Sequence, residues 1–496
     1  MINFTNRYLI LLFLCTCAMF MGACKKENWN QHNELINQSL DRNLLQEINS
    51  NPELSTFSEF LKQTGYADTL QQSKPYTVWA PSNKALESLD EDVVKNIEQL
   101  KKFVSYHISR QSYFTTMPQS ALKIKTLSGK SITFSSSKFE EASITSANNY
   151  VANGVLHIVN QAIEPKLNAS EYMQSLNQAT KQSSFIQALF HTEMDTSKAV
   201  KLYNDPITKK PVYQDGTTFA ITKNHYYQKV SDITSEDSLC TYLILTDAAY
   251  ESEKDKLRPY YNTGVDAFTD TATQWSIVRD LVFSEVYSVD DFANPITAIS
   301  GVKIRVNKDD IIETRQLSNG VAYVVDKIDY DLMENKIPTI TIQSELVDSL
   351  RVPSAATAKL KRTPSGELYT DVQASSITSS PDPLYYFRYK TAVNSVKYKV
   401  YWRAINDIYT SNINMKVDFG LSSYYPKAAQ TPLATTGYKS VAPAANNPDA
   451  YKEVLVGEYD SSTHGTLYAF LVSSLGATSA APTALTLDYI KLVPVN

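Results

Sequence analysis

Residues 76–89 read YTVWAPSNKALESL and form the most informative stretch of this 496-residue chain. The segment from Tyr76 to Ala80 is rich in aromatic and β-branched residues, which predicts a short strand. Pro81 ends the strand, and the side chain of either Ser82 or Asn83 is suited to cap a helix that begins there. The stretch therefore predicts a strand, a sharp turn and a helix in direct succession.

Two further patterns follow this stretch. A helix is expected to end at a polar aromatic pair, Tyr106-His107. Farther along, Asn153-Gly154 is typical of a tight turn and leads into a predicted strand that contains His157. Helices and short strands are thus mixed in the first third of the chain.

Two of these patterns recur later at almost the same offset. Residues 241–250 can be laid over 77–86, which pairs Asn83 with Asp247 at an offset of 247 − 83 = 164. In the same way Asn319-Gly320 pairs with Asn153-Gly154 at an offset of 319 − 153 = 166. Because two separate patterns repeat at nearly one offset, we expect a tandem duplication of one domain type.

The ordered patterns of the first copy, residues 39–167, resemble a fasciclin (FAS1) domain. Members of that family show an extended strand, an Ala-Pro-Ser/Thr-Asn/Asp turn, a Tyr-His pair and a closing Asn-Gly-x-x-His strand. The resemblance implies an α+β fold. It also implies a structural or binding role for six motif residues, Asn83, Tyr106, His107, Asn153, Gly154 and His157.

The second copy, residues 168–335, is a divergent FAS1-like domain. Leu245 replaces the Pro of the turn, the Tyr-His pair is missing from 282–285, and Tyr323 replaces the His of the closing strand. Extra segments are expected at 201–232 and 251–275. The divergence predicts that the fold is kept, while a binding role for these motifs is not implied.

From residue 336 to 496 the sequence changes to short alternating runs separated by Pro- and Asn-rich turns. This spacing predicts an all-β sandwich of the jelly-roll kind. In the run 396–404, alternation places Trp402 on the apolar face and Arg403 on the polar face, so Trp402 is expected in the core. The final run, 485–492, resembles the last strand of galactose-binding-like sandwiches.

Four tyrosines of this region are candidate glycan contacts. Tyr424 and Tyr425 lie in a turn-like stretch, and Tyr438 and Tyr451 lie in a second Pro- and Asn-rich segment. Loops at the end of a sandwich often carry binding sites, and aromatic rings can stack on sugar faces. Packing within the loops is the alternative for each ring.

The first 38 residues have the pattern of an export signal and a tether. Arg7 precedes an apolar run that is too short for a membrane span of about 20 residues. The run ends at Met21-Gly-Ala-Cys24, which resembles the bacterial lipobox and implies a signal peptide at 1–23 and lipid on Cys24. We expect 24–38 to be a polar tether and the lipid to hold the protein on the outer membrane, at the cell surface rather than facing the periplasm. An ordinary secretory signal or an N-terminal anchor helix is the alternative.

Composition limits the remaining classes of function. The net charge is −5, and no block of Lys and Arg points to nucleic acid. If the signal is removed and Cys24 carries lipid, Cys240 is the only thiol left, so the protein is not a disulfide scaffold. Cys240 lies in an apolar run and is expected to be buried.

No catalytic pattern is present in the sequence. His107 and His157 do not belong to a tight metal-binding spacing such as H-E-x-x-H. The adjacent acidic pairs would point to opposite faces of a strand and would not form one acid–base site. The sequence therefore predicts neither an enzyme nor a bound metal or other cofactor.

Together these features predict a non-enzymatic outer-membrane or surface lipoprotein for adhesion or glycan binding. The fasciclin resemblance implies adhesion to proteins and extracellular polymers. Lipoproteins that pair such domains with a sandwich look like those of Bacteroidota, some of which serve beside TonB-dependent glycan importers. The expected partners are therefore the outer membrane, a polysaccharide and a TonB-dependent receptor complex. A structural subunit that docks on an outer-membrane transporter without a soluble ligand is the alternative, and a glycan hydrolase is a third hypothesis.

Overall fold

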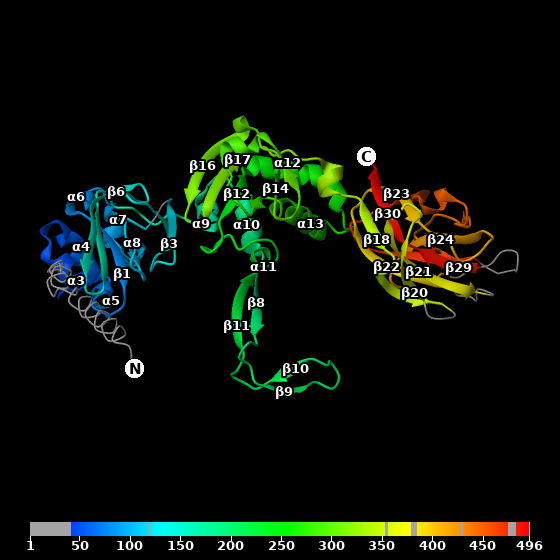
Figure 1. Ribbon diagram of the computed structural model, residues 1–496, viewed down its shortest axis with the longest axis horizontal. Coiled ribbons are helices and arrows are strands. Elements are labelled where there is room, and N and C mark those ends of the chain that lie inside the picture. Colours follow the sequence, from blue (N-terminus) through cyan, green and yellow to red (C-terminus); the bar gives the residue numbers. More distant parts are fainter. Residues whose placement is uncertain are drawn as a thin grey trace, which may run out of the picture. The chain divides into compact units, whose positions relative to one another are not determined.

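The computed structural model describes residues 41–117, 120–352, 356–377, 384–426, 430–474 and 483–495 (Figure 1). The chain forms two compact units. The first contains the chain up to Ala169 with Thr234–Ser238 and Gln316–Asn319, and the second contains Ser170–Ile233, Leu239–Arg315 and the chain from Gly320. The predicted signal, Cys24 and the tether 24–38 lie outside the described residues. Within the described residues, no helix is both long enough and apolar enough to cross a membrane.

A seven-stranded sheet with the order β2-β1-β7-β6-β5-β4-β3 forms the centre of the first unit. Its strands are β1 (Tyr76–Pro81), β2 (Ile108–Ser109), β3 (Leu122–Lys125), β4 (Ser131–Phe134), β5 (Lys138–Phe139), β6 (Ala142–Val151) and β7 (Gly154–Val159). Strand β1 is parallel to β7 and antiparallel to β2. The strand predicted from Tyr76 is therefore confirmed, and it lies inside the sheet.

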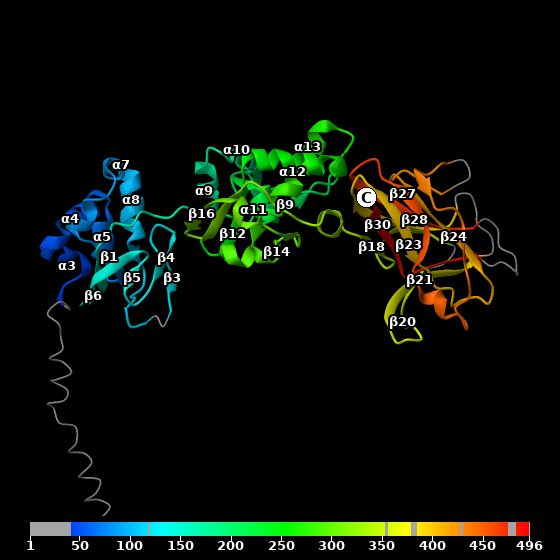
Figure 2. The ribbon, with the colours of Figure 1, turned by 90° about the horizontal axis from the view of Figure 1, so that it is seen from above.

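Helices pack against one face of this sheet; in Figure 2, α3, α4 and α5 lie to one side of β1. The helices are α3 (Leu44–Ser50), η2 (Pro52–Leu54), α4 (Ser55–Gln63), α5 (Tyr66–Leu70), α6 (Asn83–Leu86), α7 (Glu91–Lys95) and α8 (Ile97–Tyr106). Val78 and Ala80 share a core with helix residues such as Phe57. Trp79 points to the opposite face and shares a second core with Phe134. Because both faces of β1 are covered, all of its residues are buried.

Gly154 begins β7 where that strand lies directly against β1. Its φ is +154°, and a Cβ at this position would lie 2.0 Å from the carbonyl oxygen of Tyr76. A side chain would therefore force β1 and β7 apart. Tyr76 and Gly154 are the first residue pair of the parallel β1–β7 ladder, so this close contact lies where the pairing of the two strands starts.

The second unit repeats this arrangement in β12 (Cys240–Leu245) and β17 (Gly320–Val325), which are also parallel. Cys240 pairs with Gly320, and a Cβ on Gly320 would lie 1.8 Å from the Cys240 carbonyl oxygen. A hydrogen bond recurs as well. The hydroxyl of Thr77 donates to a loop carbonyl at 2.6 Å, and that of Thr241 donates to the corresponding loop at 2.7 Å.

Other elements accompany β12 and β17. The helices are α9 (Ala169–Ser175), α10 (Thr180–Ala188), α11 (His225–Lys229), α12 (Asp247–Leu257), η3 (Arg258–Tyr261), α13 (Asp266–Val278), η4 (Val289–Ala293), η5 (Lys308–Asp310) and η6 (Leu332–Lys336). The strands are β13 (Val282–Phe283), β14 (Ile296–Thr297), β15 (Lys303–Ile304) and β16 (Ile311–Leu317). The expected extra segment at 251–275 falls within α12, η3 and α13, where the first copy has α6, α7 and α8. It therefore lengthens existing helices and adds no separate module.

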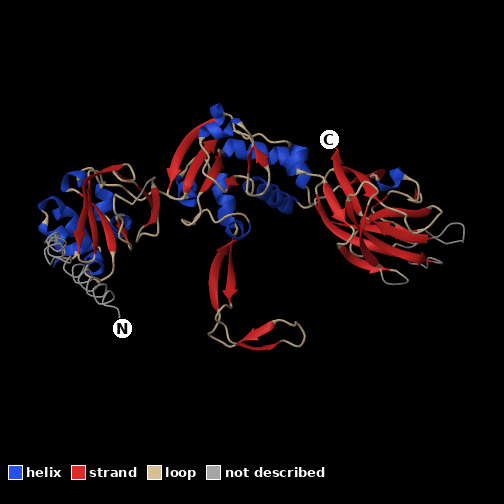
Figure 3. Cartoon of the chain, in the orientation of Figure 1, coloured by secondary structure: helices blue, strands red, loops and turns tan. Residues whose placement is uncertain are grey.

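The other expected extra segment is a projecting arm, residues 190–224 (Figure 3). It consists of two short hairpins, β8 (Phe190–Asp195) with β11 (Phe219–Asn224) and β9 (Lys201–Asn204) with β10 (Pro211–Tyr213). Each pair is a two-stranded sheet. The arm thus begins before the predicted residue 201 and ends before the predicted residue 232.

The C-terminal region is a β-sandwich, as expected. Its sheets have the orders β18-β30-β23-β27, β19-β22-β28-β24-β25 with β26 on β24, and β20-β21-β29. The strands are β18 (Ile340–Gln343), β19 (Val347–Arg351), β20 (Thr357–Arg362), β21 (Leu368–Ile377), β22 (Tyr386–Val393), β23 (Lys397–Arg403), β24 (Ile413–Gly420), β25 (Ala434–Thr435), β26 (Lys439–Val441), β27 (Val454–Asp460), β28 (Gly465–Ser473), β29 (Thr483–Leu487) and β30 (Tyr489–Val495), with one helical turn, η7 (Pro448–Tyr451). Side chains from all three sheets, including the buried Trp402, share one core. The prediction that Trp402 is a core residue is confirmed.

Candidate functional site

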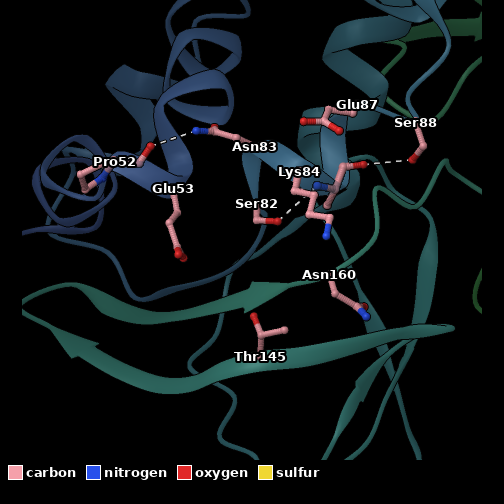
Figure 4. A pocket seen from close by; sticks show the side chains of 10 residues that line it. Pro52, Glu53, Ser82, Asn83, Lys84, Glu87, Ser88, Thr145 and Asn160 are labelled. Atoms are coloured by element: carbon pink, nitrogen blue, oxygen red, sulfur yellow. Dashed lines mark hydrogen bonds between the residues drawn. The ribbon is translucent and has the colours of Figure 1, made fainter.

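A polar recess lies in the first unit at the ends of β1 and β7 (Figure 4). Its volume is about 830 Å³, which is within the range of small-molecule sites. We call this pocket the polar recess. It is lined by Pro52, Glu53, Ser82, Asn83, Lys84, Ala85, Glu87, Ser88, Thr145 and Asn160. Most of these side chains carry a hydroxyl, amide, carboxylate or ammonium group.

The parallel pairing of β1 with β7 assembles this recess. Ser82 follows β1 and Asn160 follows β7, so the carboxyl ends of the two strands bring these residues to the same edge. The backbone N–H of Ser82 donates to the carbonyl oxygen of Val159 at 3.1 Å and fixes the two chain ends together. Thr145 is contributed by the neighbouring strand β6, and its hydroxyl donates to the Ile158 carbonyl at 3.1 Å.

The sequence left open whether Ser82 or Asn83 caps the helix that follows β1, and the structure gives the two side chains different roles. The Ser82 hydroxyl accepts a hydrogen bond from the backbone of Ala85 at 3.2 Å and is the cap of α6. The Asn83 side chain accepts from the Thr56 backbone at 3.0 Å and donates to the Pro52 carbonyl at 2.9 Å. Asn83 therefore joins the end of β1 to the start of α4 and fixes the wall of the recess that Pro52 forms.

Three charged side chains at the rim are available to a ligand. Lys84, Glu53 and Glu87 form no ion pair with any described residue, and Lys84 and Glu87 are exposed. In Figure 4, Glu53 and Lys84 extend toward the side of the recess where Thr145 and Asn160 lie. Carboxylates accept and ammonium groups donate hydrogen bonds, so the rim can bind hydroxyl groups from several directions.

The Tyr106-His107 pair is buried and has structural contacts. The Tyr106 hydroxyl donates to Glu140 at 3.3 Å. His107 Nδ1 lies 2.9 Å from the Phe103 carbonyl oxygen, while Nε2 has no hydrogen-bond partner among the described residues. Burial lowers the pKa of His107 to about 4, so the ring is neutral near neutral pH. These contacts agree with a structural role for His107.

Asn153 and His157 also stabilise the fold. Asn153 accepts from the Leu44 backbone at 2.8 Å and donates to the Leu70 carbonyl at 2.7 Å, which fastens the β7 turn to the helical layer. His157 is fully buried, and Nε2 lies 3.0 Å from the Tyr113 carbonyl oxygen. Burial lowers the pKa of His157. Of the six motif residues, only Asn83 lines the polar recess.

The four candidate glycan tyrosines have different environments. Tyr424 is only 5 % exposed, its ring packs on Phe470, and its hydroxyl donates to Asp418 at 2.8 Å. The expectation that Tyr424 is a surface ring is therefore wrong, because the sandwich covers it. Tyr425 and Tyr438 are exposed.

Tyr451 is half-buried and packs on Tyr369 with the ring centroids 6.2 Å apart. Tyr369 lines a second, smaller recess of about 450 Å³ on the sandwich. Arg403 also lines that recess and donates two hydrogen bonds of 2.8 and 3.1 Å to the Glu367 carboxylate. Burial raises the pKa of the neighbouring Asp488 to about 6.

Within the described ranges, no group of three or more His, Cys, Asp and Glu side chains is arranged to hold a metal ion. Cys240 is buried in β12, as expected, and burial raises its pKa to about 11. Sequence reasoning missed the polar recess because its residues come from η2, α6, β6 and the end of β7 and share no local pattern.

Comparisons with known proteins agree with the first copy. The family model of the Fasciclin domain matches residues 52–165. Protein sll1483 of Synechocystis sp. is 28 % identical over 127 residues, which cover 24 % of this chain and 70 % of that protein.

Two solved structures show weaker likenesses. One is a FAS1 domain pair from the insect cell adhesion molecule Fasciclin I, with 14 % identity and a TM-score of 0.22 over 57 % of this chain and 97 % of that chain. The other is a family 35 carbohydrate binding module from Clostridium thermocellum, with 12 % identity and a TM-score of 0.18 over 32 % of this chain and 99 % of that chain. TM-scores this low do not establish a common fold. The family match, with the geometry of β1 and β7, identifies residues 52–165 as a fasciclin domain.

Proposed function

We propose that this protein is a non-enzymatic adhesion protein whose fasciclin domain binds a glycan in the polar recess. The observation that carries the proposal is the lining of that recess, where Glu53, Lys84 and Glu87 surround hydroxyl and amide groups and form no ion pair with other described residues. A polyhydroxylated ligand could exchange hydrogen bonds with each of these groups. The histidines of the domain are buried and occupied in structural contacts, which favours binding over catalysis.

The same proposal places the protein on the outer membrane, preferably at the cell surface. It rests on the lipobox-like Met21-Gly-Ala-Cys24 and the polar residues 25–38, which would let the folded units stand off the lipid surface. A role beside a TonB-dependent glycan importer of Bacteroidota type is part of this proposal. Such a receptor would be the partner that takes up the bound glycan.

We further propose that residues 168–335 are a second, divergent fasciclin domain. The support is the repeated parallel strand pair, in which Gly154 and Gly320 approach the opposite strand equally closely. The C-terminal sandwich, of jelly-roll or galactose-binding-like type, would add a second glycan contact at Tyr369 and Arg403. Arginine and carboxylate groups beside an aromatic ring suit sugar hydroxyls and faces.

The test is affinity electrophoresis of the full-length protein in gels that contain a panel of bacterial and plant polysaccharides. The triple variant Glu53→Gln, Lys84→Met and Glu87→Gln removes the unpaired charges without removing an internal ion pair. We expect one or more polysaccharides to retard the wild type and the variant to lose most of that retardation. Lys95→Met is the matched control, because the Lys95 side chain is exposed, forms an ion pair with the nearby Glu91 and lies outside the recess. Absence of retardation by every polysaccharide, or equal retardation of the triple variant, would reject the recess as the glycan site.

A further inference from the structure

The end of the projecting arm combines exposed apolar and basic side chains. We call residues 198–213 the arm tip. Its exposed apolar side chains are Val200 (50 %), Leu202 (58 %), Tyr203 (57 %) and Ile207 (89 %). Its lysines, all exposed, are Lys198, Lys201, Lys209 and Lys210. In Figure 1, β9 and β10 lie at the far end of the arm from α11.

The apolar side chains are held outward by the structure of the hairpin. Asp205 accepts hydrogen bonds from the backbones of Ile207 at 2.9 Å and Thr208 at 2.6 Å, so the turn is ordered and Ile207 is presented at its outside. The arm tip contains four lysines and one carboxylate, that of Asp205, so its net charge is 4 − 1 = +3. None of the four lysines forms an ion pair within the described part of the chain.

From this arrangement we infer that the arm tip is a membrane-interface anchor that binds the headgroup region of an anionic lipid bilayer. This inference is independent of the lipid on Cys24 and of glycan binding. A two-stranded hairpin with its apolar residues in water is marginally stable, so burial of those residues in another medium would stabilise it. Segments that lie in a membrane interface combine Lys or Arg with apolar and aromatic side chains, as the tip does. The positive tip also complements anionic headgroups in a chain whose net charge is −5.

The geometry favours lipid over a protein partner. Leu202 and Tyr203 are consecutive in β9, so their side chains point to opposite faces, and both are exposed. A protein docked on one face of β9 would leave either Leu202 or Tyr203 in water, whereas the interface of a lipid bilayer can surround both side chains. Lysine is also depleted in the buried parts of protein interfaces. A symmetric contact with a second copy would bring two positive tips together.

The test uses the full chain with Ile207→Cys carrying an environment-sensitive fluorophore. The matched probe is Phe268→Cys, because Phe268 is also well exposed, at 66 %, but lies near the acidic Asp266 and Asp270. Labelling of the wild type measures any background from its own cysteines, Cys15, Cys17, Cys24 and the buried Cys240. Vesicles of phosphatidylcholine, with and without phosphatidylglycerol, are then added to each labelled protein.

We expect a blue shift at position 207 with phosphatidylglycerol vesicles, quenching by lipids that carry a nitroxide, and no shift at position 268. Adding Lys209→Glu and Lys210→Glu should weaken the apparent vesicle affinity reported at 207 by about tenfold or more. Since these positions are exposed, the changes remove no core contact, and unchanged circular dichroism would verify the fold. No shift at 207, an equal shift at 268, or a shift that depends only on protein concentration would overturn the inference; the last result would instead show self-association.

Discussion

Acid should destabilise the first unit specifically through His107. The ring is fully buried, its Nε2 has no hydrogen-bond partner in the described part of the chain, and its Nδ1 lies within hydrogen-bond distance of the Phe103 carbonyl. Protonation would place a charge and an unsatisfied N–H inside the core between Phe103 and Phe139, whose ring centroids lie 4.5 and 5.1 Å from that of His107. The unfolded chain, in contrast, takes up this proton freely.

The size of the effect follows from the two pKa values. Folding lowers the pKa of His107 from 6.5 to about 4, so the unfolded state binds more protons between these limits. The contribution to stability is therefore fully present above about pH 6.5 and is lost as the pH falls toward 4. At about 1.4 kcal/mol per pKa unit, the loss between about pH 7.5 and pH 5 is about 2 kcal/mol.

The assay compares the wild type with His107→Phe in urea at several pH values. Phenylalanine keeps an aromatic ring but cannot titrate, and at about pH 7.5 the lost bond to Phe103 should cost about 1–2 kcal/mol. Unfolding is followed by pulsed hydrogen exchange in peptides that contain β1, because a signal from the whole chain would mix separate units. The stability of the wild type relative to His107→Phe should fall by about 2 kcal/mol toward pH 5, which cancels or reverses the initial difference, while the contribution of His157 cancels. If both proteins lose stability equally, His107 is not the group responsible.

Two further predictions concern the central strands. Gly154→Ala should destabilise the first unit by about 3 kcal/mol or more, because its Cβ would meet the Tyr76 carbonyl, whereas Gly129→Ala meets no atom within 4 Å and should cost about 1–2 kcal/mol from its positive φ. Urea midpoints measure both, and equal costs would contradict the close-approach explanation. The thiol of Cys240, with its pKa raised to about 11, should stay unmodified by iodoacetamide near neutral pH until urea unfolds β12. Mass spectrometry of the peptide that contains Cys240 measures this, and rapid modification of the folded protein would show that the thiol is accessible.

Local sequence patterns predicted several elements of the fasciclin domain correctly, because neighbouring residues determine those elements. The strand at Tyr76, the cap before α6 and the glycine at 154 depend on residues close in sequence or on backbone geometry. The repeated offset of 164 to 166 also located β12 and β17, although their parallel pairing, like that of β1 and β7, was seen only in the structure. Alternation also predicted that Trp402 belongs to the core.

Tertiary packing decided the cases in which local reasoning failed. Tyr424 lies in a turn-like stretch, but Phe470 and Asp418 from other strands take up its ring and hydroxyl. Arg403 has the alternation of an outward residue, yet it is only 6 % exposed because Glu367 and Asp488 lie against it. No local sequence pattern shows that residues distant in sequence bury the side chains of Tyr424 and Arg403. The polar recess has the same origin, since strand pairing alone brings its residues together.

The parallel strand pairs β1–β7 and β12–β17 also affect how the chain folds during synthesis. Tyr76 pairs with Gly154, a separation of 154 − 76 = 78 residues, and Cys240 pairs with Gly320, a separation of 320 − 240 = 80 residues. In both pairs the first strand is synthesised long before its partner, and pairing between residues so far apart in sequence slows folding and prolongs the exposure of apolar strands to aggregation. The arm, residues 190–224, precedes β12 and so leaves this closing loop almost unchanged. Residues 168–335 thereby include a long projection without a greater sequence separation between β12 and β17.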